Sequence, residues 1–224
     1  MPAVASPAAQ DYLKCIYSLM NERGDRMRIT TKAVADRMGV SAASATNMLK
    51  KLHSMGLAAH RPYRGVELTE SGLKIALEVI RHHRLLETYL AEALGVPWDR
   101  VHQEAEVLEH VLSEDLEERI ATLLGDPTED PHGHPIPSRE LDMPVISARV
   151  LWQVDDGQEV AVDRVSDSAA EALRYLDELG IRPGVKVRVL DRGPVDGPLF
   201  VDVEGRRGQR QALSRELAEG VWVA

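Results

Sequence analysis

The spacing of apolar residues predicts three amphipathic helices, at 11–20, at about 70–94 and at 102–119. Thr69 stands before the second helix as its expected N-cap. Gly95 and Pro97 separate the second helix from the third, so we expect these two helices to pack antiparallel and face to face. The third helix, HQEAEVLEHVLSEDLEER, has an apolar stripe formed by Ala105, Leu108, Leu112 and Leu116.

Residues 30–57 have the pattern of a helix-turn-helix. Gly39 suits the tight turn, Ser41 is a natural N-cap of the second helix, and Gly56 ends that helix. The next segment, LAAHRPYRGVELT, has the pattern strand, turn, strand. These elements indicate a winged helix-turn-helix. We favour it over a structural helical hairpin because the wing, the glycine spacing and the local positive charge agree.

From residue 145 onward the pattern changes to short alternating strands, interrupted by one helix at about 169–179. The segment GIRPG is typical of a turn before a strand. All eight histidines lie at or before His134. We therefore do not expect this last part of the chain to form a metal centre of its own.

Charge is divided unevenly along the chain. Residues 1–70 hold 10 Lys and Arg against 6 Asp and Glu, residues 71–144 hold 6 against 16, and residues 145–224 hold 11 against 14. A basic first part followed by a strongly acidic second part favours DNA as the partner of the first and cations as the partner of the second. The one cysteine, Cys15, excludes an internal disulfide framework and is typical of the reducing cytoplasm. We find no run of about eighteen apolar residues and no secretory leader, so we expect neither a membrane span nor secretion.

If the winged module binds DNA, its second helix enters the major groove with the N-terminal end toward the bases. Asn47 is the best hydrogen-bonding reader of base edges. For each side chain taken alone, a solvated surface position is an equally good interpretation. The residues expected to face bases are Ser41, Ala43, Ser44 and Asn47. The residues expected to reach phosphates are Thr46, Lys50, Lys51, Arg61 and Arg64.

Histidines and carboxylates gather along the two acidic helices. His83 and Glu87 lie within the apolar face of the helix at 70–94, where a carboxylate needs a cation or a donor. A satisfied hydrogen bond between the two would be enough for this pair alone. Six such groups meeting at one seam repel one another unless divalent cations occupy it, so we favour metal sites over a solvated acidic face. The helix at 102–119 supplies His102, Glu106, Glu109 and His110.

Several sequence blocks resemble the metal-dependent repressors typified by the diphtheria toxin repressor and the manganese transport regulator. The resemblance covers nearly the whole chain and rests on DYLKCIY, the helix-turn-helix, HHRLLETYL, VHQEAEVLEHVLSEDLEERI and PHGHPIP. It implies a homodimer that binds operator DNA when a divalent metal is bound. It also implies a multidomain α+β fold with a winged helix-turn-helix domain at 1–72, a helical metal-binding and dimerisation domain at 73–144, and a small SH3-like β-barrel of the ferrous-transport-A type at 145–224.

The same resemblance implies two groups of metal ligands. Asp11 and Glu106 stand where iron-type members have sulfur ligands, so the expected cofactor is Mn(II), with Fe(II) second. Lys14 departs from the manganese-type pattern, which has a glutamate there, and a charged lysine cannot be a ligand. One group consists of Asp11, Glu106, Glu109 and His110. The other consists of His83, Glu87 and His102.

The second group lacks the ligands that related proteins take from the third domain. The aligned positions are Ala169 and Ala172, and Glu171 is the nearest carboxylate. Another subgroup uses a Cys-Pro-His segment, which Asp130, Pro131 and His132 resemble, so Asp130 or His132 is the alternative ligand. A linker that merely needs rigid turns explains DPHGHPIP equally well.

We favour a repressor of metal-uptake and homeostasis genes that has no enzymatic activity. In this hypothesis the metal ties the first helix to the acidic helices and fixes the angle between the two DNA-reading heads of a dimer. A winged-helix regulator of an organic ligand would instead need an apolar pocket and no metal. A metallohydrolase would need an open coordination position, and the chain has neither an HExxH block nor a nucleophile elbow.

Overall fold

The computed structural model describes residues 5–23, 29–61, 65–144, 149–195, 197–206 and 208–224. The chain forms two compact units, and each is described by itself. The first unit ends at His82 and also includes 109–112 and 137–142, whereas the second holds 83–108, 113–136 and the chain from Met143 on. Among the described helices, none combines the length and apolar character needed to cross a membrane.

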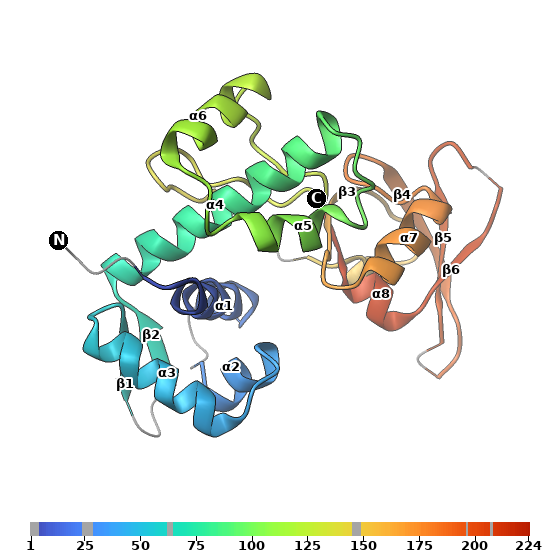
Figure 1. Ribbon diagram of the computed structural model, residues 1–224. Coiled ribbons are helices and arrows are strands. Elements are labelled where there is room, and N and C mark those ends of the chain that lie inside the picture. Colours follow the sequence, from blue (N-terminus) through green and yellow to red (C-terminus); the bar gives the residue numbers. More distant parts are fainter. Residues whose placement is uncertain (1–4, 24–28, 62–64, 145–148, 196, 207) are drawn as a thin grey trace. The chain divides into compact units, whose positions relative to one another are not determined.

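The first unit contains the winged helix-turn-helix that the sequence predicts. Between its two central helices Gly39 has a φ of +63°, and the Ser41 side chain accepts a hydrogen bond from Ser44 N at 3.1 Å. Leu13 and Leu49 are fully buried in its core. In Figure 1 the helices are followed by the two-stranded wing. The elements are α1 (Pro7–Arg23), α2 (Thr31–Arg37), α3 (Ala42–Ser54), β1 (Ala58–Arg61), β2 (Gly65–Leu68) and the first part of α4 (Glu70–Glu92).

The single helix expected at 102–119 is wrong. Two helices stand there, α5 (Val101–Leu108) and α6 (Glu114–Leu123), and Ser113 is the N-cap of the second. The Ser113 hydroxyl accepts the Leu116 N–H, and a serine at this position favours a helix start over a helix interior. Glu109 and His110 therefore lie in a turn and do not continue the stripe of His102 and Glu106.

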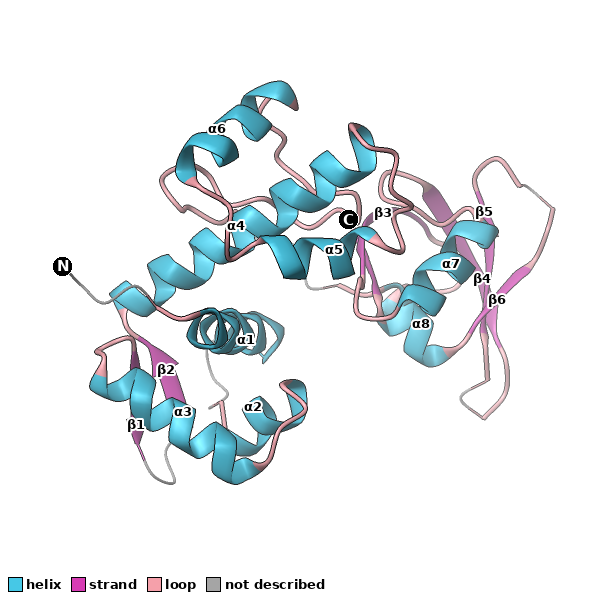
Figure 2. Cartoon of the chain, viewed as in Figure 1, coloured by secondary structure: helices cyan, strands magenta, loops and turns pink. Residues whose placement is uncertain are grey.

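The second unit ends in a five-stranded antiparallel sheet with the strand order β6-β5-β4-β3-β7, which Figure 2 shows beside two helices. Alternate residues of the strands point into its core, as in β5, where Val201 is fully buried between two half-buried neighbours. The elements are η1 (Leu151–Gln153), β3 (Glu159–Val165), α7 (Ala170–Leu179), β4 (Lys186–Arg192), β5 (Leu199–Val203), β6 (Gln211–Leu213), α8 (Arg215–Glu219) and β7 (Val221–Val223).

The segment DPHGH is fastened to β3 within the second unit. Val165 N donates to His132 O at 2.9 Å. Gly133 has a φ of +86°, and a Cβ atom there would lie 2.2 Å from the Asp163 carbonyl oxygen. Only glycine fits this close approach. The segment is therefore a fixed part of the unit and holds His132 in a defined position.

Candidate metal centre

One group of possible ligands lies in the first unit and consists of Asp11, Glu109 and His110. His110 Nε2 is 2.8 Å from Asp11 Oδ1 and 3.6 Å from Glu109 Oε1. The other ring nitrogen, Nδ1, is 2.8 Å from Gln10 Oε1. Because an amide oxygen only accepts, Nδ1 carries the proton and leaves the lone pair of Nε2 facing the two carboxylates. This tautomer is the one a metal ligand needs.

Lys14 brings a fixed positive charge to this group. Its Nζ atom lies 2.6 Å from Glu109 Oε1 and 2.9 Å from Oε2. Burial raises the pKa of Asp11, and attraction to His110 and Lys14 only partly opposes the effect. The group therefore holds Glu109 against a cation that belongs to the chain.

Glu106, the fourth ligand expected here, belongs to the second unit. Its side chain is 54% exposed, and its Oε1 atom is 3.5 Å from His102 Nε2. The break between α5 and α6 separates it from Glu109 in the backbone path.

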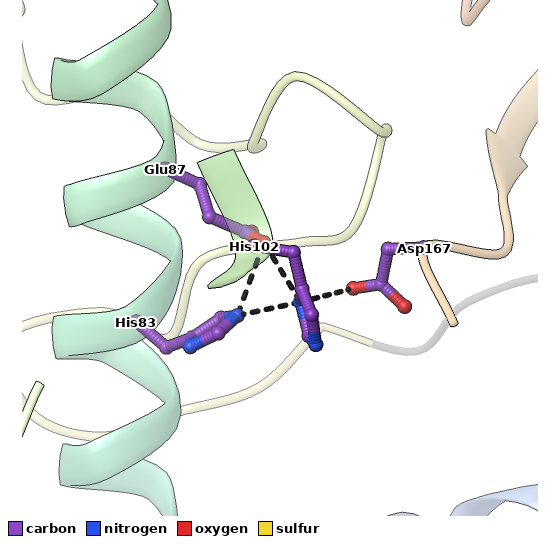
Figure 3. A group of neighbouring side chains, drawn as sticks. All are labelled: His83, Glu87, His102 and Asp167. Carbon is purple, nitrogen blue, oxygen red and sulfur yellow. Dashed lines mark hydrogen bonds and ion pairs between the residues drawn. The ribbon is translucent and has the colours of Figure 1, made fainter. Parts of the chain in front are cut away.

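A second group consists of His83, Glu87, His102 and Asp167, all in the second unit. Figure 3 shows His83 and Glu87 projecting from α4 toward His102, with Asp167 approaching His102 from the loop between β3 and α7. Glu87 Oε1 is 3.0 Å from His83 Nε2 and 3.1 Å from His102 Nδ1. Asp167 Oδ2 is 3.5 Å from His102 Nδ1. Glu87 is fully buried, as its place on the apolar face of α4 predicts.

The electrostatics of this group favour bound positive charge. Burial opposes the ionisation of Glu87, but attraction to His83 and hydrogen bonds with His102 and His83 outweigh it and lower its pKa. For His102, burial alone would lower the pKa, whereas hydrogen bonds with Asp167, Glu106 and Glu87 raise it. Without a metal, protons on imidazole supply the positive charge that the carboxylates require. Metal binding must displace these protons.

A third group, Asp130, His132 and His134, lies in the DPHGH segment. Asp130 Oδ1 accepts from the backbone N–H groups of His132 and His134, at 2.8 and 2.9 Å, which leaves Oδ2 facing His134 Nδ1 at 3.3 Å. His132 Nε2 is 2.8 Å from the Trp98 carbonyl oxygen. The turn thus orients one carboxylate oxygen and two imidazoles.

The residues present fit divalent cations. Four buried side-chain atoms have no hydrogen-bond partner among the described residues, and three of them belong to these groups: Glu87 Oε2, Asp130 Oδ2 and His132 Nδ1. An orphaned buried acceptor costs about 1–3 kcal/mol, which a cation would offset. Imidazole nitrogen and carboxylate oxygen without sulfur suit Mn(II), Fe(II) and Zn(II).

The structure adds ligands that the sequence did not point to. Asp167 supplies the carboxylate from the C-terminal part of the chain, whereas Glu171 is exposed in the first turn of α7 and is not in the group. His134 and Gln10 were also missed, although each stands within two residues of a predicted ligand.

The predicted DNA contacts lie on α3 and the wing. Side chains in the first turn of α3 are exposed, as is Asn47, whereas Thr46 is half-buried and donates to Ala42 O at 2.7 Å. Arg64 lies outside the described residues. The exposed members of the predicted set are Ser41, Ala43, Ser44, Asn47, Lys50, Lys51 and Arg61.

Comparison with protein families matches three domain models along the chain. Residues 5–66 match the N-terminal DNA-binding domain of iron-dependent repressors, and residues 69–138 match their metal-binding and dimerisation domain. Residues 150–224 match the FeoA domain. The iron-dependent repressor IdeR of Mycobacterium leprae is 31% identical over 225 residues, which cover 95% of this chain and 94% of IdeR. This chain belongs to the iron-dependent repressor family.

The repressor is also similar to solved structures along nearly its whole length. A manganese-dependent transcriptional repressor in complex with manganese is 42% identical, with a TM-score of 0.88 over 96% of this chain and 99% of that one. ScaR with bound Zn²⁺ is 32% identical, with a TM-score of 0.81 over 96% and 98%. The protein is thus a metal-dependent transcriptional repressor with a C-terminal SH3-like domain. Its relatives are named as DNA-binding repressors, not as enzymes.

Proposed function

We propose that this repressor is a homodimer that binds operator DNA in the cytoplasm when Mn(II) is bound, with Fe(II) as the second choice of metal. The observation that carries the proposal is the group formed by Asp11, Glu109 and His110, because it joins α1 of the DNA-binding unit to the turn after α5. Its donors are oxygen and nitrogen without sulfur, a set that suits Mn(II) and Fe(II). We include Glu106 as the fourth ligand on the basis of the family resemblance.

The DNA-binding part of the proposal is supported by α3. Its N-terminal turn exposes Ser41, Ala43 and Ser44, and Asn47 follows one turn later on the exposed surface. A helix that enters the major groove contacts bases with such N-terminal residues. Lys50 and Lys51, both exposed, suit phosphates.

The homodimer is supported by apolar side chains that the single chain leaves exposed. On α5 and α6 of the second unit, Val107, Leu116 and Leu123 are 72%, 48% and 68% exposed. Burial of such side chains against a second copy stabilises association. These helices lie in the residues that match the dimerisation domain.

The metal supplies positive charge that several donors share, and the residues supply its position. Asp11 connects the charge to α1, whereas Glu109 and His110 connect it to the turn after α5. Gln10 holds the His110 ring in the required tautomer. Fixing α1 in this way restricts the DNA-binding unit, so that both α3 helices of a dimer reach half-sites about 34–36 Å apart, or a multiple of that spacing.

The test is metal removal followed by metal-by-metal addition. A DNA fragment is first selected from a random pool with the Mn(II)-loaded protein, and its binding is then measured by fluorescence anisotropy. We expect chelation to abolish specific binding, Mn(II) to restore it best, and Asp11→Asn to prevent the restoration. Glu104→Gln, which changes an exposed carboxylate on α5, serves as the matched control.

Equal DNA binding with and without chelator would overturn the proposal and would favour a regulator of an organic ligand. Metal-dependent hydrolysis without metal-dependent DNA binding would favour an enzyme. Restoration by Fe(II) at lower free concentration than Mn(II) would reverse the order of the two metals.

A further inference from the structure

We propose that the second unit binds two divalent cations side by side, bridged by the carboxylates of Glu87 and Asp167. One cation would take the imidazoles of His83 and His102, and the other would take the DPHGH segment through Asp130, His132 and His134. The proposal rests on the metal dependence argued above, but it concerns a different place and adds an ion. We call the seven residues the bridged cluster.

The two oxygens of Glu87 face different sets of imidazoles. Oε1 lies 3.0 Å from His83 Nε2 and 3.1 Å from His102 Nδ1. Oε2 has no hydrogen-bond partner among the described residues and lies 3.9 Å from His132 Nδ1. Because Glu87 is fully buried, water does not satisfy the second oxygen at the protein surface. A carboxylate with its two oxygens aimed at two sets of donors is suited to bridging two metals.

Asp167 repeats this arrangement. Its Oδ2 atom is 3.5 Å from His102 Nδ1 and 3.8 Å from His134 Nδ1, so it also contacts both sets. It reaches the cluster from the loop between β3 and α7, opposite the side from which α4 delivers Glu87 (Figure 3). Two carboxylates on opposite sides can hold two cations about 3.5–4 Å apart, the spacing of two-metal sites.

The tautomer of His132 makes its free nitrogen a metal ligand. The Trp98 carbonyl can only accept, so His132 Nε2 must donate its proton at 2.8 Å, and Nδ1 of the neutral ring then carries a lone pair. This lone pair faces Glu87 Oε2, which is also an acceptor, and both atoms are buried. Two buried acceptors face each other without a proton to share. A cation between them satisfies both.

One cation cannot use all these donors. The bridged cluster offers four imidazoles and three carboxylates, whereas Mn(II) in oxygen and nitrogen sites is commonly six-coordinate. The donor atoms of Asp130, His132 and His134 lie within 4.8 Å of one another, as a set apart from His83 and His102. Neutralisation also favours two ions, because near these three carboxylates Arg84 supplies one fixed charge, 3.8 Å from Asp130.

The test uses the full-length protein and Mn(II) alone. After equilibrium dialysis, the bound Mn(II) is counted by elemental analysis, and electron paramagnetic resonance reports whether two ions share bridging ligands. We expect about three Mn(II) ions per chain, one at Asp11 and two in the bridged cluster, and an exchange-coupled spectrum from the pair. His132→Gln should remove one ion and the exchange coupling, whereas His53→Gln, at an exposed position on α3, should change neither.

About two Mn(II) ions per chain in the wild type without exchange coupling would overturn the proposal, because the cluster would then hold a single ion. This wild-type result decides the question even if His132→Gln does not fold. Asp11→Asn separates the two proposals: it should abolish Mn(II)-dependent DNA binding yet keep the coupled spectrum. If DNA binding ignores the metal while the coupled spectrum persists, the proposed function fails and the bridged cluster stands.

Discussion

Lys14 gives the first metal-binding group a cation of its own. Its ammonium contacts both oxygens of Glu109, whose side chain is 1% exposed. A metal that binds Glu109 must compete with this ion pair and approach a like charge. Lys14 therefore keeps α1 near the turn after α5 when no metal is present, and it weakens metal binding.

Lys14→Met tests this role. We expect the affinity for Mn(II) to rise about tenfold or more, and the metal-free protein to lose about 1–3 kcal/mol of stability because buried Glu109 loses a charged donor. Mn(II) titration and thermal unfolding with chelator measure the two effects. Lys74→Met removes an exposed lysine that pairs with Glu70 on α4, and it should leave Mn(II) affinity unchanged. Unchanged or weaker Mn(II) binding by Lys14→Met would show that the ion pair does not oppose the metal.

The ligands that could be predicted are those whose spacing follows a helix. His83 and Glu87 lie one turn apart on the apolar face of α4, and their burial was expected from that position. Asp167 could not be found in this way, because it stands in a loop and reaches the group only through the packing of β3. The sequence directed attention to Glu171, four residues later, which the start of α7 turns toward solvent.

At the scale of elements, strong local signals predicted the fold best. Gly39, Ser41 and Gly56 mark the turn, the start and the end around α3, and the structure has all three as expected. The helix predicted at 102–119 failed because a periodic pattern does not show that Ser113 begins a new helix. The dependence of Glu109 and His110 on a turn is therefore a tertiary property.

Asn47→Ala tests the role of α3 as the reading helix. Asn47 is exposed, so we expect little change in stability but a loss of about 1–3 kcal/mol in binding to the selected DNA. Lys51→Ala should instead weaken binding to all sequences and reduce the salt dependence by about one phosphate contact. Anisotropy titrations at several salt concentrations measure both. Equal losses on selected and random DNA for Asn47→Ala would exclude base reading by this residue.

Gly133→Ala tests how the DPHGH segment is held against β3. The new Cβ would lie 2.2 Å from Asp163 O, so the segment must move, and His132 with it. We expect a loss of about 2 kcal/mol or more in unfolding free energy and one fewer Mn(II) ion in the bridged cluster. Gly157→Ala is the matched control, since Gly157 also has a positive φ, +82°, but open space around its Cβ position. Similar losses for both variants would mean that backbone strain alone, not contact with β3, is responsible.

At the scale of the whole molecule, the charge distribution connects metal to DNA. Residues 1–70 carry a net +4 and residues 71–144 a net −10, from counts of 10 against 6 and 6 against 16. Bound divalent cations reduce the negative charge of the second part, which otherwise repels DNA phosphates. The effect acts together with the restriction of α1.

Linkage makes the coupling measurable from both sides. If Mn(II) tightens DNA binding by a given factor, DNA must tighten Mn(II) binding by the same factor. We expect Mn(II) titrations with and without the selected DNA to give the factor found by anisotropy, and Asp11→Asn to bring both factors toward one. Unequal factors in the wild type would indicate that Mn(II) also acts by changing the oligomeric state.

Trp98 lies at the junction of the DPHGH segment and the core of the C-terminal sheet. Its ring centroid is 5.5 Å from that of His132, and its carbonyl holds the His132 proton. Mn(II) is paramagnetic and quenches the emission of a nearby indole. The protein therefore contains a natural fluorophore beside its second ion, and arrival and departure of that ion can be followed in real time, without a label, as dimming and recovery of Trp98. Trp98→Phe should abolish the signal.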